Sequence, residues 1–175
     1  MLHQTLKDLI GQHVEQAGSS VTESGLRFDF THFEPIDKNN ILEIEKVINK
    51  KISSFLPVKV EQLSYEDALK TGAAAQFGEK YGDIVRVVSV GDYSCELCGG
   101  THVENSGQIG AFKILSESGI AAGIRRIEAI TGTMVYEKLN DAESIVFKAS
   151  ESLKTNPEGL LNRINSLNDE IKSYK

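Results

Sequence analysis

The chain is poor in the residues that define several protein classes: its 175 residues include no tryptophan, three prolines and two cysteines. The two cysteines, Cys95 and Cys98, stand three residues apart, which excludes the disulfide framework of a small secreted protein. Long apolar runs are also missing, since stretches such as 119–124 fall far below the ~18 residues that span a membrane. The first residues lack the charged and apolar regions of an export signal. We therefore expect an intracellular, cytoplasmic protein without a membrane segment.

The net charge and the length of the chain exclude further classes of protein. Because 19 lysines and arginines stand against 25 aspartates and glutamates, the formal net charge is −6. A generally basic nucleic-acid-binding surface is therefore excluded, and any contact with RNA must be local. Apolar residues make up 40% of the chain and charged residues 25%, a composition typical of folded globular proteins. The length fits one domain and an appendage.

Apolar residues at spacings of three and four predict a first helix over residues 2–17, with His13 on its apolar face. Asp37 is a suitable N-cap for a second helix, which Pro57 ends. The other predicted elements are a hairpin with Gly25 at its turn, a short helix capped by Ser64, and strand-like stretches over 58–63, 84–90, 88–97, 111–115 and 124–130. We expect an α+β fold in which a mostly antiparallel sheet packs around the central N-terminal helix.

The sequence pattern changes after Gly132. An apolar stripe predicts a helix over 133–155, Asn156-Pro157 breaks it, and apolar residues over 158–174 alternate by four and three. Two heptads bury too little apolar area to be stable alone. We interpret 133–175 as a helical linker or coiled-coil segment, and we expect 158–174 to pack on the preceding helix or to self-associate with another chain.

One cluster of residues has metal-ligand chemistry in both members, Cys98 and His102. A thiolate and an imidazole on a tight glycine-bearing turn suit zinc, although a catalytic zinc needs three protein ligands. On spacing alone, a buried turn cysteine beside a surface histidine is the more common arrangement. A redox dithiol with Cys95 and a thiol nucleophile with His102 as base are further alternatives. Positions three apart on a strand face opposite sides, so we expect Cys95 to be a packing residue.

Other polar residues have simpler interpretations. His32 follows a predicted strand, where a structural hydrogen bond is more common than a metal. Arg125 and Arg126 place one guanidinium on each face of a strand, where pairing with a nearby acid is the usual outcome.

Five segments of the chain carry a family resemblance: 11–19, 27–30, 77–83, 96–103 and 116–132. Together they resemble the editing domain of alanyl-tRNA synthetases, occur in the family's order and cover roughly residues 1–132. Related editing domains of threonyl-tRNA synthetases share the architecture but differ around the cysteine, so the Cys-Gly-Gly-Thr-His form favours the alanyl type.

The resemblance implies hydrolysis of Ser-tRNA(Ala) and Gly-tRNA(Ala), with the acceptor end of tRNA(Ala) as partner. A pocket for alanine cannot sterically exclude glycine and rejects an added hydroxyl only ~10²-fold, so fidelity requires a second, hydrolytic site. In the family, zinc is held by the equivalents of Cys98 and His102 together with two histidines of a His-x-x-x-His motif, and Gln16 matches a glutamine of the editing pocket. ATP and Mg²⁺ would serve only the aminoacylation domain of a longer enzyme.

The chain departs from the family at its start. The His-x-x-x-His motif would precede Met1, and His3 matches a later histidine that is not a ligand. We therefore expect residues 1–132 to be an N-terminally truncated editing domain with half of the zinc site, followed by the helical segment 133–175. The alternatives are a catalytically inactive tRNA-positioning module and part of a free-standing deacylase. Ala74 and Gln76 replace larger apolar residues of the family, which concerns local packing only.

Overall fold

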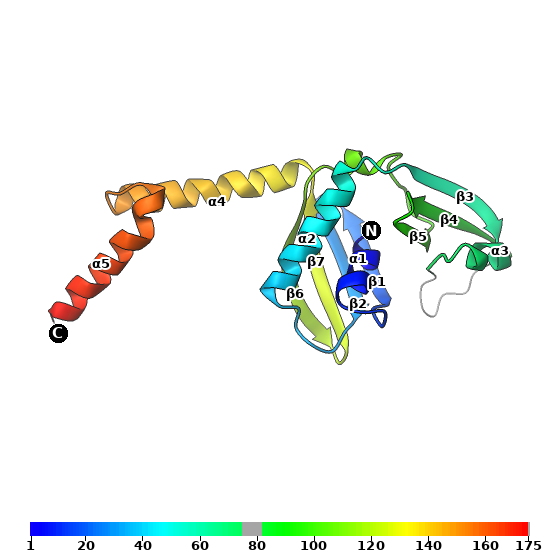
Figure 1. Ribbon diagram of the computed structural model, residues 1–175, viewed down its shortest axis with the longest axis horizontal. Coiled ribbons are helices and arrows are strands. Elements are labelled where there is room, and N and C mark those ends of the chain that lie inside the picture. Colours follow the sequence, from blue (N-terminus) through cyan, green and yellow to red (C-terminus); the bar gives the residue numbers. More distant parts are fainter. Residues whose placement is uncertain (75–81, 175) are drawn as a thin grey trace. The chain divides into compact units, whose positions relative to one another are not determined.

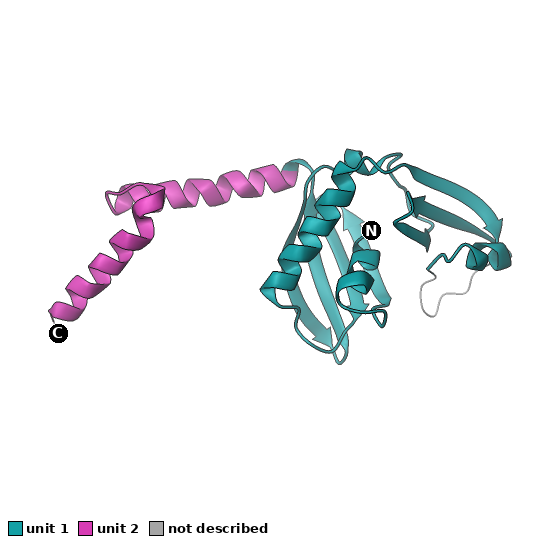
Figure 2. Ribbon diagram, in the orientation of Figure 1, with its two compact units in different colours: residues 1–133 teal, residues 134–175 magenta. Residues whose placement is uncertain are grey.

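The computed structural model describes residues 1–74 and 82–174, which form two compact units, 1–133 and 134–175 (Figure 2). The expected α+β class is confirmed, because helices are combined with two sheets whose strands pair antiparallel (Figure 1). Most of the matching segment 77–83 and the departure at Gln76 lie outside the described residues.

A four-stranded antiparallel sheet forms the larger part of the first unit, with the order β1-β2-β7-β6. Its strands are β1 (Gln16–Thr22), β2 (Gly25–Thr31), β6 (Phe112–Ala121) and β7 (Ile124–Thr131). The hairpin around Gly25 is confirmed, since Thr22 pairs with Gly25. Alternate residues of β2 and β7, such as Phe28, Phe30 and Ile127, point into the core.

Helix α2 (Lys38–Ser53) covers this core with Ile44, Ile48 and Ile52, which are buried at helical spacing. The predicted cap is confirmed, because the Asp37 carboxylate accepts hydrogen bonds from the backbone N–H groups of residues 39 and 40. Helix and sheet thus bury one shared apolar layer.

The prediction of a first helix over 2–17 is wrong beyond residue 9. Helix α1 (Leu2–Leu9) is short, and Gln16 already begins β1. Gly11 has a φ of 144°, a conformation that a helix does not contain and that favours glycine. Pairing of Gln16 with Phe30 then extends the chain, so His13 lies exposed in the connection and not on a helix face.

The expectation of one sheet is also corrected, because a second sheet has the order β3-β4-β5. Its strands are β3 (Val58–Ser64), β4 (Ile84–Val90) and β5 (Ser94–Leu97), and α3 (Tyr65–Lys70) follows β3. Ser64 caps α3 as predicted. The strand-like stretch 88–97 is interrupted by a tight turn at Gly91, which has a φ of 48°, and Tyr93 N–H donates to the carbonyl of Val90.

The two arginines of β7 form ion pairs, as predicted. Arg126 forms a bidentate ion pair with Asp29, with N–O distances of 2.7 and 2.9 Å. Arg125 forms a bidentate ion pair with Glu117. Neither guanidinium is therefore free for phosphate.

In the second unit, the predicted break near Asn156-Pro157 is confirmed. Helix α4 (Thr133–Ser152) ends before it, the 3₁₀ turn η2 (Pro157–Gly159) contains the proline, and α5 (Leu160–Ser173) follows. The apolar side chains of Leu161 and Ile171 are exposed within this unit. In the part of the chain that the structure describes, no helix has the length and apolar character needed to cross a bilayer.

Candidate functional site

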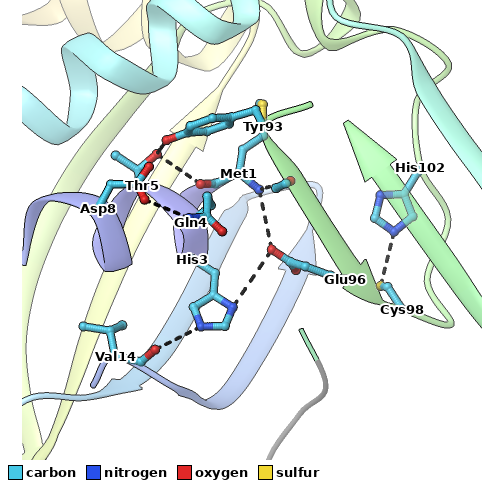
Figure 3. A network of polar contacts seen from close by, with 11 residues as sticks. Met1, His3, Gln4, Thr5, Asp8, Val14, Tyr93, Glu96, Cys98 and His102 are labelled. Carbon is cyan, nitrogen blue, oxygen red and sulfur yellow. Dashed lines mark hydrogen bonds and ion pairs between the residues drawn. The ribbon is translucent and has the colours of Figure 1, made fainter. Parts of the chain in front are cut away.

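Cys98 and His102 lie together just after β5, where they meet across the turn between them (Figure 3). His102 Nε2 is 3.2 Å from Cys98 Sγ. Arg86 of β4 holds this turn from the neighbouring strand: its guanidinium donates to the carbonyls of Cys98 (2.8 Å) and Gly100, and its own carbonyl accepts from Cys98 N–H. The backbone of the turn is therefore held at Cys98 and at Gly100.

Both side chains line a cavity of about 160 Å³ in the first unit. Its lining combines apolar side chains, four of them valines, with polar ones. The remaining lining residues are Met1, Val58, Val88, Val90, Ser94, Glu96, Val103, Ser106 and Ile109. The cavity has the size and mixed character of a site for a small polar ligand.

Glu96 is a cavity residue that we did not predict. It precedes Cys98 by two positions, and the alternation of side chains along β5 places both on one face. That alternation was readable in the sequence. The contact of the Glu96 carboxylate with the buried His3 of α1 was not: Glu96 Oε1 lies 4.0 Å from His3 Nδ1, across 93 residues of sequence.

Burial lowers the pKa of His3, while Glu96 and the Val14 carbonyl oppose this shift. The His3 Nε2 atom is 3.2 Å from that carbonyl, and the residue is only 7% exposed. A histidine whose folded pKa is depressed binds fewer protons than in the unfolded chain. Folding stability is therefore full above the unfolded pKa of about 6.5 and decreases as the pH falls through it.

We predict that the free energy of unfolding decreases between pH 7.5 and pH 5.5, and that His3→Gln reduces this dependence. The glutamine amide can still donate to the Val14 carbonyl but does not titrate. Urea unfolding at both pH values measures the effect. His32 and His102 have lowered pKa values too, so part of the dependence should remain in the variant. An identical pH dependence in both proteins would contradict the prediction.

Gln16 lies at the start of β1, where its side-chain amide donates to Ser19 Oγ at 3.0 Å. It is not one of the residues that line the cavity with Cys98. The predicted helix would have carried Gln16, and the early end of α1 changes its position. Its role in an editing pocket stays a prediction.

Cys95 faces away from this cavity. It packs beside the buried core of the second sheet, and Ser89 Oγ donates to its sulfur at 3.4 Å. Cys95 and Cys98 are both free thiols. Their placement on opposite sides agrees with the packing role expected for Cys95.

The two donors at Cys98 and His102 fit zinc. Tetrahedral zinc, with bonds of about 2.3 Å to sulfur and 2.0–2.1 Å to nitrogen, separates the two ligand atoms by about 3.5 Å, so the observed 3.2 Å needs only a small opening. Partial burial and the positive charge of Arg86 lower the pKa of His102, against the opposing effect of Glu96, and so favour the neutral ring that binds metals. Within residues 1–74 and 82–174, no group of three potential ligands is assembled.

Part of the chain matches a known domain family, and nearly all of it matches known enzymes. Residues 85–128, which include β4, β5 and the Cys98–His102 turn, match the threonyl and alanyl tRNA synthetase second additional domain. The alanine–tRNA ligases of Bacillus anthracis and Bacillus cytotoxicus are each 53% identical over 175 residues, and alanine–tRNA ligase 1 of Lachnoclostridium phytofermentans is 53% identical over 173 residues. These matches cover 99–100% of this chain and 20% of each relative, so the chain spans about a fifth of their length.

Proposed function

Because this chain matches a segment of alanyl-tRNA synthetases over its entire length, we propose that residues 1–132 form their editing domain and act in hydrolysis of Ser-tRNA(Ala) and Gly-tRNA(Ala). The resemblance predicted from the sequence is confirmed by these relatives, which are enzymes by name. The hydrolytic role and its substrates are our inference. Residues 133–175 are proposed as the helical linker of the same enzyme.

The observation that carries the proposal is the meeting of Cys98 Sγ and His102 Nε2, 3.2 Å apart, on the wall of a small cavity. An editing site for Ser-tRNA(Ala) and Gly-tRNA(Ala) must admit small aminoacyl groups. A cavity of about 160 Å³ with valine walls suits such groups, but alanine is intermediate in size between glycine and serine, so size alone does not spare Ala-tRNA(Ala). The polar lining groups Glu96, Cys98 and His102 suit the ester that is to be hydrolysed.

Cys98 and His102 would hold Zn²⁺, with further donors that are not assembled within the described residues. Zinc bound there would supply a Lewis acid beside the ester carbonyl. Arg86 keeps the ligand turn in place through its two carbonyl contacts. The Glu96 carboxylate lies in the same cavity and can accept a hydrogen bond from the substrate's amino or hydroxyl group.

The partner in this proposal is the acceptor end of tRNA(Ala), which must bind locally because the chain carries a net charge of −6. ATP and Mg²⁺ belong to the aminoacylation part of the longer enzyme, and the proposed location is the cytoplasm. A second candidate function is supported by the ligand set, of which the described residues assemble only Cys98 and His102: residues 1–175 alone would be a tRNA-positioning module without hydrolytic activity.

Deacylation of Ser-tRNA(Ala) tests the proposal. The substrate is incubated with the 1–175 chain and with the same chain extended upstream through a His-x-x-x-His helix turn. We expect hydrolysis of Ser-tRNA(Ala) and Gly-tRNA(Ala) by the extended chain, little by 1–175, and none of Ala-tRNA(Ala) by either. A folded extended chain that leaves Ser-tRNA(Ala) intact would reject the editing function.

We also propose that 158–174 self-associates. Within its unit α5 leaves Ile164 38% exposed and Ile171 58% exposed, seven residues apart on the apolar stripe that Leu160 and Leu167 complete, and such a stripe on a helix is a common dimer surface. Sedimentation of the 1–175 chain over a range of concentrations should show a dimer that Ile171→Glu weakens. A monomer at all concentrations would contradict self-association.

A further inference from the structure

A second cluster of ligand-type side chains lies outside the cavity, where His13 and His32 approach each other. His13 Nε2 is 2.9 Å from His32 Nδ1. His13 lies in the connection between α1 and β1, and His32 follows β2 directly. Because β1 and β2 are antiparallel, the start of one strand meets the end of the other, and both histidines come to the same end of the hairpin.

The backbone on both sides of the pair is fixed. Thr31 Oγ1 donates to the carbonyl of His13 (2.8 Å) and accepts from the N–H of Glu15 (2.9 Å), and Thr31 N–H donates to the Glu15 carbonyl. His32 N–H donates to the Gly123 carbonyl at 3.0 Å. The two rings are therefore brought together by paired strands, and not by the free movement of two loops.

Gly11 makes room for the His13 ring. A Cβ at this position would lie 2.8 Å from His13 Nδ1 and 2.9 Å from its Cε1, closer than such contacts occur. The ring thus packs against bare backbone, which limits the directions in which it can turn. A ligand that is held in place before metal arrives loses less conformational freedom on binding.

Both rings can present a lone pair. The pKa of His32 is lowered by burial, by His13 and by Arg125, while Glu34 and Glu117 oppose the shift. Arg125 is itself paired with Glu117, so these two charges largely cancel each other. His13 is exposed to solvent, which leaves the pair accessible to an ion.

We propose that His13 and His32 form a two-imidazole binding site for a late first-row divalent cation such as Ni²⁺, Cu²⁺ or Zn²⁺, with water in the other positions. Two nitrogens bound at about 2.0–2.1 Å and at right angles are about 2.9 Å apart, the spacing that the pair already has. In the hydrogen bond, one of the two facing ring nitrogens carries a proton. When the metal binds, this proton moves to the other nitrogen of the same ring. Both rings then bind as neutral imidazoles and no net proton is released. A small tilt of both rings turns the two lone pairs toward one ion.

This site differs from the structural hydrogen bond that the sequence favours for His32. Without metal the two rings are joined by a hydrogen bond, as observed. A bound metal ion would take the position between the two nitrogens that the proton of this hydrogen bond occupies. The site is independent of Cys98 and His102, so it does not depend on the editing function. It predicts a second metal-binding event that survives removal of that cysteine and histidine.

Titration with Ni²⁺ tests the site, because Ni²⁺ does not oxidise the remaining thiol. The 1–175 chain carrying Cys98→Ser and His102→Ala is titrated calorimetrically at pH 7.5, after metal stripping. We expect one equivalent of Ni²⁺ to bind, and either His13→Gln or His32→Gln, added separately, to weaken binding by about tenfold or more. All of these proteins also carry His3→Gln, because a free amino terminus two residues before a histidine is itself a nickel-binding sequence. Gln12→Ala, which changes a neighbour outside the pair, is the matched control and should leave the affinity unchanged.

Amide spectra of the same background protein locate the bound ion. Paramagnetic Ni²⁺ should broaden the signals of residues 12–14 and 31–33 first, and unchanged spectra of the variants without metal show that they fold. Equal Ni²⁺ affinity in the parent, His13→Gln and His32→Gln proteins would overturn the proposal. Broadening centred on other residues would overturn it as well.

Discussion

Replacing Cys98 with alanine should reduce hydrolysis of Ser-tRNA(Ala) by at least about 100-fold in a chain that contains all of the metal ligands, because even the loss of a group that supports a ligand costs 10–100-fold. Cys98 supplies the only sulfhydryl group on the cavity wall among the described residues, 3.2 Å from His102 Nε2. The extended chain described above is the enzyme for this measurement, and initial rates with labelled Ser-tRNA(Ala) are the readout.

Cys95→Ala is the matched control for this variant. It removes the same thiol three residues away, on the face of β5 that packs against the core of the second sheet. We expect a small loss of stability and an unchanged deacylation rate. If Cys95→Ala and Cys98→Ala slowed the reaction equally, the thiol of Cys98 would have no special role, and its assignment as a ligand would be wrong.

The second large effect concerns zinc itself. The metal-stripped and reduced 1–175 chain should bind Zn²⁺ at least about 100-fold more weakly than the extended chain, since the described residues bring only two donors, Cys98 and His102, together at the proposed site. His3 cannot replace them, because it is buried, its Nε2 contacts the Val14 carbonyl and its Nδ1 faces Glu96. Competition with a chromophoric chelator at pH 7.5 measures both affinities.

The pair His13 and His32 must be removed for a clean comparison, since it is proposed to bind metal independently. Both chains therefore carry His13→Gln and His32→Gln, and His102→Ala is introduced into each as a further test. The expected result is that His102→Ala abolishes the tight site of the extended chain. Equal and tight binding of zinc by both chains would mean that residues 1–175 already contain a complete site.

The sequence predicts correctly those features of the fold that depend on residues close together in the chain. The cap at Asp37, the cap at Ser64 and the break at Pro157 all depend on groups within four residues, and all are present. The predicted first helix is too long because Ala17 continues the helical spacing of apolar residues by coincidence. The backbone conformation of Gly11 and the pairing of Gln16 with Phe30 override that spacing, and neither can be read from periodicity.

The candidate site, too, was predictable only where its contacts join residues close together in the chain. The approach of Cys98 to His102 needs only a tight turn, so spacing and family resemblance identified the pair. The position of Glu96 follows from strand alternation. The contact of His3 with Glu96 and that of His13 with His32 depend on how distant elements pack, which one sequence without structure does not give.

The valines of the cavity give its wall a particular stiffness. Val58 and Val90 are direct partners across β3 and β4, and Val88 lies two residues along on the same face. A β-branched side chain is confined to few χ1 values, and on a paired strand its backbone is confined too. The wall therefore cannot reshape itself around a bulkier ligand by side-chain rotation alone. Discrimination by size at this cavity rests on the rigidity of a sheet, and a ligand too large to fit would have to separate two hydrogen-bonded strands.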